Sequence, residues 1–168
     1  WGFGRILALV LLDYVIPFEA FLKEINEQAG VDYRIASGGG RMKVTMDRYE
    51  ADWGMVALGW KTHVAGQGRA FPSAERAILT YRDEKPGIID QDLPAFVVAD
   101  AEGPVGPIRD GDSVIYFNFR GDRAIEICKA FEEESLDKFE RVPRPEVAYA
   151  GMMEYDTEAH IPRNYLVE

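Results

Sequence analysis

The chain has 168 residues, of which 47% are hydrophobic and 29% charged, a composition typical of one globular domain with a real core. Its formal net charge of -10 argues against nucleic acid or an anionic membrane as the main partner, because both are polyanions. A small anion remains compatible, since arginines in a cleft outweigh a global field that salt screens within about 8 Å. The single cysteine, Cys128, excludes a disulfide framework and fits a reduced, cytoplasmic compartment.

The first thirty residues predict one strand followed by one helix. Residues 6–12 form an apolar run that is too short to span a membrane. With Arg5 before it the run loosely resembles a signal peptide, but no small-residue cleavage site follows, so we interpret it as a buried strand. The helix ends at Gly30 and has one apolar face, formed by Phe18, Phe21, Leu22 and Ile25. Because the chain opens at Trp1 and not at Met, we expect a fragment of a longer protein.

Three further helices are predicted from apolar spacing and capping residues. The first ends near Gly66 and buries one face, formed by Trp53, Val56, Trp60 and Val64. The second is capped by Ser73, ends before Pro86 and buries Ala74, Ala77, Ile78 and Tyr81. The third begins at Asp122, and its inward residues are Ala124, Ile127, Cys128 and Phe131.

Short strands are expected after the first helix at residues 33–36, 42–46, 95–99, 114–119 and 147–153. A turn-forming stretch at residues 103–107 separates two of them, and the tail to Glu168 resembles a linker or an incomplete element. Since strands alternate with helices, the predicted fold class is α/β, with a mainly parallel sheet flanked by helices. The apolar run at residues 114–117 agrees with this, because parallel strands are buried on both faces.

The first candidate binding segment is glycine-rich and basic. It reads Ser37-Gly38-Gly39-Gly40-Arg41 and continues, four residues later, as Met46-Asp47-Arg48. Three glycines after a strand allow a sharp turn and a close approach of the backbone to a ligand, with Arg41 at the mouth of the turn. A plain flexible loop is the alternative, and spacing alone leaves it open. A P-loop is excluded, because no Gly-Lys-Ser/Thr follows.

The second candidate segment ends a strand and opens a helix with two arginines. It reads Phe117-Asn118-Phe119-Arg120-Gly121-Asp122-Arg123. Ligands collect at the carboxyl ends of strands in α/β sheets, and a helix N-terminus favours anions. The planar fork of arginine matches phosphate and carboxylate, so several arginines suit a phosphorylated acid. The alternative is an ion-pair network in which Arg120 and Arg123 pair with Asp122, Glu126 or other acids.

Five stretches of the chain are similar to stretches that mark the cofactor-independent phosphoglycerate mutases. They are residues 35–42, 44–50, 117–123, 131–139 and 149–152, which read IASGGGRM, VTMDRYE, FNFRGDR, FEEESLDKF and YAGM. The similarity runs from about Val31 to the end, about four-fifths of the chain. The stretches are long and stand in the family's order, which makes the resemblance specific.

The resemblance implies a 2,3-bisphosphoglycerate-independent enzyme of the alkaline phosphatase superfamily. Such enzymes interconvert 3-phosphoglycerate and 2-phosphoglycerate in glycolysis through a phosphoserine intermediate. One domain holds two Mn²⁺ ions and the serine nucleophile, and a second domain, inserted into the first, holds the glycerate. Carried over by motif, the substrate-binding residues are Arg41, Arg48, Arg120 and Arg123. The resemblance places no catalytic residue in this chain, and both Mn²⁺ ions would be bound by the absent domain.

The resemblance divides the chain into three parts. Residues 1–30 are an unmatched strand and helix, residues 31–155 a segment of the substrate-binding (phosphotransferase) domain, and residues 156–168 a linker toward the absent metal-binding domain. The family's histidine and Arg-Asp pair from the earlier part of that domain are not found, and Lys43 stands where an aromatic is usual. These departures favour the alternative of a catalytically empty phospho-acid-binding or interaction module. We expect the chain alone to be inactive, monomeric and cytoplasmic, with no nucleic-acid or membrane partner.

The remaining reactive side chains are assigned to structure. His63 lies close to an apolar helix face and is expected to be a half-buried structural residue, whereas His160 lies in a polar tail. Neither opens a ligand motif, and a two-metal site needs several converging Asp, Glu and His ligands. Cys128 is expected in the core. The acidic run at residues 132–134 is expected to be a solvated helix end and not a cation site.

Overall fold

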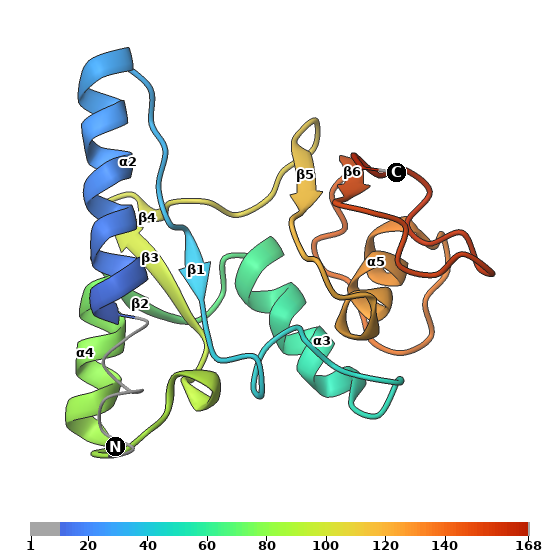
Figure 1. Ribbon diagram of the computed structural model, residues 1–168, viewed down its shortest axis with the longest axis horizontal. Coiled ribbons are helices and arrows are strands. Elements are labelled where there is room, and N and C mark those ends of the chain that lie inside the picture. Colours follow the sequence, from blue (N-terminus) through green and yellow to red (C-terminus); the bar gives the residue numbers. More distant parts are fainter. Residues whose placement is uncertain (1–10, 168) are drawn as a thin grey trace.

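The computed structural model describes residues 11–167, which form a mixed α/β structure (Figure 1). Its α-helices are α2 (Ile16–Ala29), α3 (Trp53–Gly59), α4 (Ala74–Glu84) and α5 (Ile125–Glu132). Shorter helical turns are η1 (Leu11–Val15), η2 (Trp60–Val64), η3 (Asp90–Asp92) and η4 (Gly121–Arg123). Its strands are β1 (Ser37–Gly38), β2 (Arg69–Phe71), β3 (Phe96–Asp100), β4 (Gly103–Pro104), β5 (Ser113–Tyr116) and β6 (Ala148–Gly151).

The strands form two small sheets and not one mainly parallel sheet. In the first, β3 pairs in parallel with β2 on one side, and antiparallel with β1 and with β4. In the second, β5 and β6 pair in parallel. The α/β class is therefore confirmed, but the mainly parallel sheet is not. The antiparallel pairing of β3 with β4 has a local cause, because the chain turns back directly after Asp100 through a two-residue turn.

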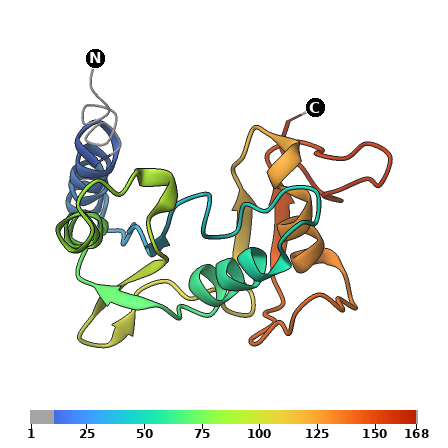
Figure 2. The same cartoon turned by 90° about the horizontal axis from the view of Figure 1, so that it is seen from below.

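Two apolar clusters form the cores of the described chain. The first lies between α4 and the four-stranded sheet, where Phe71 packs edge-on against Tyr81 and Phe96. The second joins α3 and η2 to α5 around Trp60, which is 1% exposed and packs against Phe131 and Phe139. Figure 2 shows α2 and α4 together at one end, α5 at the other and α3 between them. The α3–η2 helix therefore connects both ends of the molecule.

The predicted helices are present, and the ends of two of them have the expected causes. The last was predicted to begin at Asp122, but that residue lies in η4 and α5 begins at Ile125. Gly30 has a φ of 65° and terminates α2 by donating its N–H to the Asn26 carbonyl. Ser73 caps α4 by accepting the Arg76 N–H at 3.0 Å. The helix through Trp60 ends at Ala65, just before Gly66, as the spacing predicted. The apolar face of α2 is the exception, since Phe18 and Phe21 are about half exposed and no described residue of α2 is fully buried.

Several strand predictions were wrong in extent. Residues 6–10 of the first predicted strand lie outside the described residues, and residues 11–12 belong to η1. Residues 42–46 form turns, with Thr45 at a φ of 67°, and residues 33–36 lie just before β1. The strand at 114–119 ends at Tyr116, and Phe117 is 80% exposed. The expectation that this strand is buried on both faces was also wrong, because Ser113 and Ile115, which share one face of β5, are exposed.

Within residues 11–167, no helix has the length and apolar character that crossing a membrane requires.

Candidate functional site

The fold brings the two arginine-bearing segments together. Arg123 in η4 donates from Nη1 to the Met46 carbonyl at 2.8 Å. Arg48 forms an ion pair with Asp122, with its Nη2 3.0 Å from the carboxylate oxygen Oδ2. These two contacts join positions more than seventy residues apart in the sequence. Arg48 and Arg123 therefore lie at one junction between the loop before α3 and the start of α5.

The turn that carries Arg48 has an unusual backbone. The Ala51 N–H bonds to the Arg48 carbonyl, and the two residues between them, Tyr49 and Glu50, have φ values of 62° and 57°. Positive φ at both central positions is normally supplied by Asn or Gly. Each such residue costs on the order of 1–3 kcal/mol, so contacts elsewhere must hold the turn. The Arg48 guanidinium lies 5.0 Å above the Tyr49 ring, which adds a cation–π contact.

A group of charged side chains from α5 contacts this turn. The Glu126 carboxylate accepts the Glu50 N–H at 2.8 Å, and the Lys129 ammonium lies 2.5 Å from the Glu50 carboxylate. The hydrogen bond from Lys129 lowers the pKa of Glu50. Burial raises the pKa of Glu126, and repulsion from Asp47 and Glu50 acts in the same direction. The turn that carries Arg48 is thus hydrogen-bonded to a buried acid of α5.

The other two predicted arginines are placed differently. Arg41 is exposed and donates from Nε and Nη2 to the side-chain oxygen of Gln91, at 3.2 and 3.1 Å. Arg120 is exposed at the end of the turn that leads into η4, and its carbonyl accepts a hydrogen bond from Asn118. Arg48 and Arg123 thus meet at the junction through Met46 and Asp122, while Arg41 is hydrogen-bonded to a separate loop.

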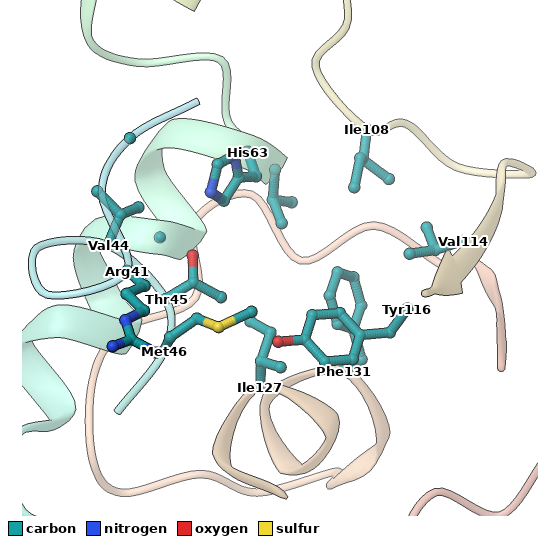
Figure 3. A pocket seen from close by; sticks show the side chains of 13 residues that line it. Arg41, Val44, Thr45, Met46, His63, Ile108, Val114, Tyr116, Ile127 and Phe131 are labelled. Carbon is teal, nitrogen blue, oxygen red and sulfur yellow. The ribbon is translucent and has the colours of Figure 1, made fainter. Parts of the chain in front are cut away.

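A cavity of about 310 Å³ adjoins this junction. Figure 3 shows Arg41, Thr45 and Met46 on one side of it and Tyr116 and Ile127 on the other. The walls are largely apolar. The remaining lining residues are Val44, Val64, Ile108, Val114, Phe131, His63 and two glycines. The cavity gives the arginine junction an apolar neighbour of small-ligand size.

His63 is half-buried on the cavity wall, as predicted for a structural residue. Its Nδ1 lies 2.8 Å from the Ser37 hydroxyl, which joins η2 to β1. Burial lowers the pKa of His63, so the ring is neutral at physiological pH. The sequence reasoning did not link His63 to Ser37, because no local spacing relates positions 26 residues apart.

The glycine run at 38–40 approaches the protein's own chain. A Cβ at Gly38 would meet the Phe96 ring at 2.5 Å, and one at Gly40 would overlap the backbone of Gln91. Gly40 also donates its N–H to the Leu93 carbonyl at 2.8 Å. Close packing against β3 and the loop before it therefore explains two of the three glycines without a ligand.

The other assignments to structure agree with the sequence. Cys128 is fully buried, and burial raises the pKa of its thiol to about 12. His160 is exposed and contacts Glu154 at 2.9 Å. In the acidic run, Glu134 is exposed, whereas Glu132 accepts the Arg163 N–H at 2.8 Å. Across residues 11–167, no three His, Cys, Asp or Glu side chains are grouped in a way that could hold a metal ion.

Glu126 was missed as a site residue and considered only as an ion-pair partner. It does not lie on the apolar spacing that defines the inward face of α5, yet it is 2% exposed. The sequence offered one signal that Glu126 is buried, namely its position directly before the buried pair Ile127 and Cys128. Its contact with Glu50, 76 positions away, could not be read from the sequence.

Comparison with known proteins identifies the type of enzyme to which this architecture belongs. A crystal structure of Leishmania mexicana phosphoglycerate mutase, determined at low cobalt concentration, superposes with a TM-score of 0.91 at 51% sequence identity. The match covers 94% of this chain and 29% of that one. The fold is thus that of part of a phosphoglycerate mutase.

The sequence comparisons define the family. The chain belongs to the family described as BPG-independent PGAM N-terminus (iPGM_N), whose model matches residues 10–157. A probable 2,3-bisphosphoglycerate-independent phosphoglycerate mutase from Leptospira interrogans is 60% identical over 93% of this chain. The Trypanosoma brucei brucei 2,3-bisphosphoglycerate-independent phosphoglycerate mutase is 57% identical over 89% of it. The chain spans only 28% and 27% of these two relatives.

Proposed function

We propose that this chain is the glycerate-binding part of a phosphoglycerate mutase that interconverts 3-phosphoglycerate and 2-phosphoglycerate. The observation that carries the proposal is the meeting of Arg48 and Arg123 at one junction, through the Met46 carbonyl and Asp122. The family membership supplies the substrate class, and the arginines of the two segments supply the anion-binding chemistry. Two adjacent arginines match a phosphate or carboxylate better than one, because each donates two parallel hydrogen bonds.

In this proposal the four arginines orient the substrate. Arg48 and Arg123 hold one anionic group at the junction, and Arg41 and Arg120 complete the site when the ligand is bound. Binding orients the glycerate so that either hydroxyl meets a phosphoserine in another part of the enzyme. The cavity beside Met46 offers an apolar wall next to the proposed site.

The proposal extends to the organisation of the whole protein. Residues 31–155 form the binding segment, with residues 1–30 preceding it and residues 156–168 leading toward a metal-binding domain. The protein acts in glycolysis, in the cytoplasm, as a monomer. It requires no 2,3-bisphosphoglycerate, as the names of its relatives state for those enzymes.

Two Mn²⁺ ions and a serine nucleophile would be supplied outside this chain. The side chains at residues 11–167 do not fit a metal pair, because no three potential ligands are grouped among them. His160, the more exposed histidine, is already hydrogen-bonded to Glu154 and is distant in sequence from the arginine segments. The role assigned to this chain is therefore binding and orientation only.

NMR titration of the purified chain with 3-phosphoglycerate tests the proposal. We expect binding with a Kd of roughly 1 mM, because only one part of the full site is present. Shifts should concentrate at the side chains of Arg48 and Arg123, and binding should weaken with added salt. No shift at any of the four arginines at several times that concentration would refute the proposal.

Two arginine variants test in the same titration whether the binding depends on a particular side chain. Arg120→Lys keeps the charge but loses the planar fork, so the affinity should fall about fivefold with little effect on folding. Arg76→Lys is the matched control, since Arg76 is an exposed arginine on α4, outside both arginine segments. Unchanged affinity in both variants would mean that the chain attracts the ligand by general charge, which both substitutions keep, and has no built site at Arg120.

A further inference from the structure

The Arg48 turn is held from outside, because its own residues do not favour its conformation. Tyr49 and Glu50 both have positive φ, and neither is a residue type that adopts this region readily. Such a backbone persists where surrounding contacts determine it, and it is concentrated at functional sites. The contacts that determine it here can be identified from the neighbouring side chains.

Glu126 makes the central contact. Its Oε1 accepts the N–H of Glu50 at 2.8 Å, directly within the turn, although Glu126 itself is 2% exposed. A buried carboxylate is costly unless it is hydrogen-bonded, yet its second oxygen, Oε2, has no hydrogen-bond partner in the structure. An apolar side chain at this position would offer no acceptor for the Glu50 N–H.

Two other contacts stabilise the same turn from its flanks. Asp47 is 5% exposed and accepts the Asp52 N–H at 2.9 Å, across the base of the turn. Lys129, three residues after Glu126 on α5, pairs with the Glu50 side chain. Glu126 differs from both because it accepts a hydrogen bond from the strained backbone itself. It lies in the first turn of α5, just after η4 and Arg123.

We propose that Glu126 is a positioning residue, which holds the Arg48 turn against the start of α5 so that Arg48 and Arg123 face one anion together. The inference rests on the proposed function, since it assigns Glu126 a role in that same site. The physical basis is preorganisation: a turn fixed before binding does not lose conformational entropy when the ligand arrives. Glu126 touches no ligand itself and acts through Glu50 and Arg48.

Three variants separate positioning from general stability. Glu126→Ala removes the acceptor, and the affinity for 3-phosphoglycerate should fall about tenfold, the effect of one lost hydrogen bond to a charged group. Glu126→Gln keeps a carbonyl oxygen for the Glu50 N–H, so the affinity should stay within about threefold of the parent. Glu132→Ala is the matched control, because Glu132 on the same helix also accepts a distant backbone N–H, that of Arg163.

At temperatures where all three variants are folded, we expect the affinity for 3-phosphoglycerate to fall in Glu126→Ala. It should be retained in Glu126→Gln and in Glu132→Ala. Equal affinity in Glu126→Ala and the parent chain would overturn the proposal. So would equal losses in Glu126→Ala and Glu132→Ala, because the effect would then be one of stability.

A second readout needs no ligand. The Glu50 amide proton should be protected from hydrogen exchange in the parent chain and in Glu126→Gln, and lose at least tenfold of that protection in Glu126→Ala. If the parent chain does not bind 3-phosphoglycerate, the proposed function fails while this exchange measurement still reports on the turn. Unchanged protection of Glu50 in Glu126→Ala would overturn the positioning role whatever the binding result.

Discussion

The contact between Arg48 and Asp122 agrees both with an anion-binding site and with a surface ion-pair network. Their 3.0 Å ion pair is what a surface network would contain, and Arg48 is about half exposed. An exposed pair of this kind contributes only about 0–1 kcal/mol, too little to offset a strained turn. The buried Glu126 contact and the Arg123 bond to a backbone carbonyl are not needed for a surface pair. At the scale of single residues, these two contacts distinguish the junction from an isolated surface ion pair.

Glu126 also gives a prediction about pH. Burial raises its folded-state pKa above the ordinary value of 4.5, so protonation of Glu126 favours the folded chain. This contribution is fully present below the unfolded-state pKa and is lost as the pH rises through the folded-state pKa. Glu126→Gln removes the titration, so its free energy of unfolding relative to the parent should increase between pH 4.5 and neutrality.

Urea unfolding at a series of pH values measures this difference. Glu102→Gln is the control, because Glu102 is exposed in the turn between β3 and β4, and its difference from the parent should show a much smaller change with pH. A difference for Glu126→Gln that stays constant or falls with rising pH would contradict the prediction.

At the scale of the elements, the glycine run that begins in β1 and continues to Gly40 gives a prediction about packing. Gly40→Ala places a Cβ onto the backbone of Gln91, which cannot move aside as a side-chain tip can. We expect a loss of about 1–3 kcal/mol in the free energy of unfolding. Gly68→Ala is the matched control, because its Cβ would meet Val97 at an ordinary 3.4 Å, and it should cost clearly less. Urea denaturation measures both, and equal losses would show that close packing is not the reason for Gly40.

The helices could be predicted from the sequence, whereas the sheets could not. A helix such as α4 has its cap and its apolar face within a dozen residues, so Ser73 and Tyr81 are sufficient signals. A strand of two or three residues has no such internal signal, and β2, a partner of β3, was not predicted at all. Its pairing depends on contacts between residues 27 positions apart, which local patterns do not report.

The candidate site shows the same division. The arginine segments could be recognised as candidate anion-binding segments from the sequence, because the arginine side chain and its place at the end of a strand are both local features. The contact partners were not, since Gln91, Met46 and Glu126 are reached only through the fold. Asp122, which the sequence suggested as a partner of Arg120 or Arg123, instead contacts Arg48.

For the molecule as a whole, the surface is unusually apolar around the second sheet and the arginine junction. Phe117 is 80% exposed, and Phe119 and Tyr49 are each 77% exposed. The chain spans less than a third of the relatives and of the solved structure that it matches.

The chain alone should therefore not catalyse the mutase reaction, even with added Mn²⁺. Catalysis requires a nucleophile that accepts the phosphoryl group and cations that stabilise it, and residues 11–167 contain no group of three potential metal ligands. Orientation by arginines supplies binding but no route for phosphoryl transfer. An assay coupled to enolase measures the formation of 2-phosphoglycerate, with a full-length relative such as the Trypanosoma brucei brucei enzyme as the positive control. Turnover by the purified chain above a mock preparation, at a rate that rises with Mn²⁺, would contradict this prediction and require a catalytic centre within the chain itself.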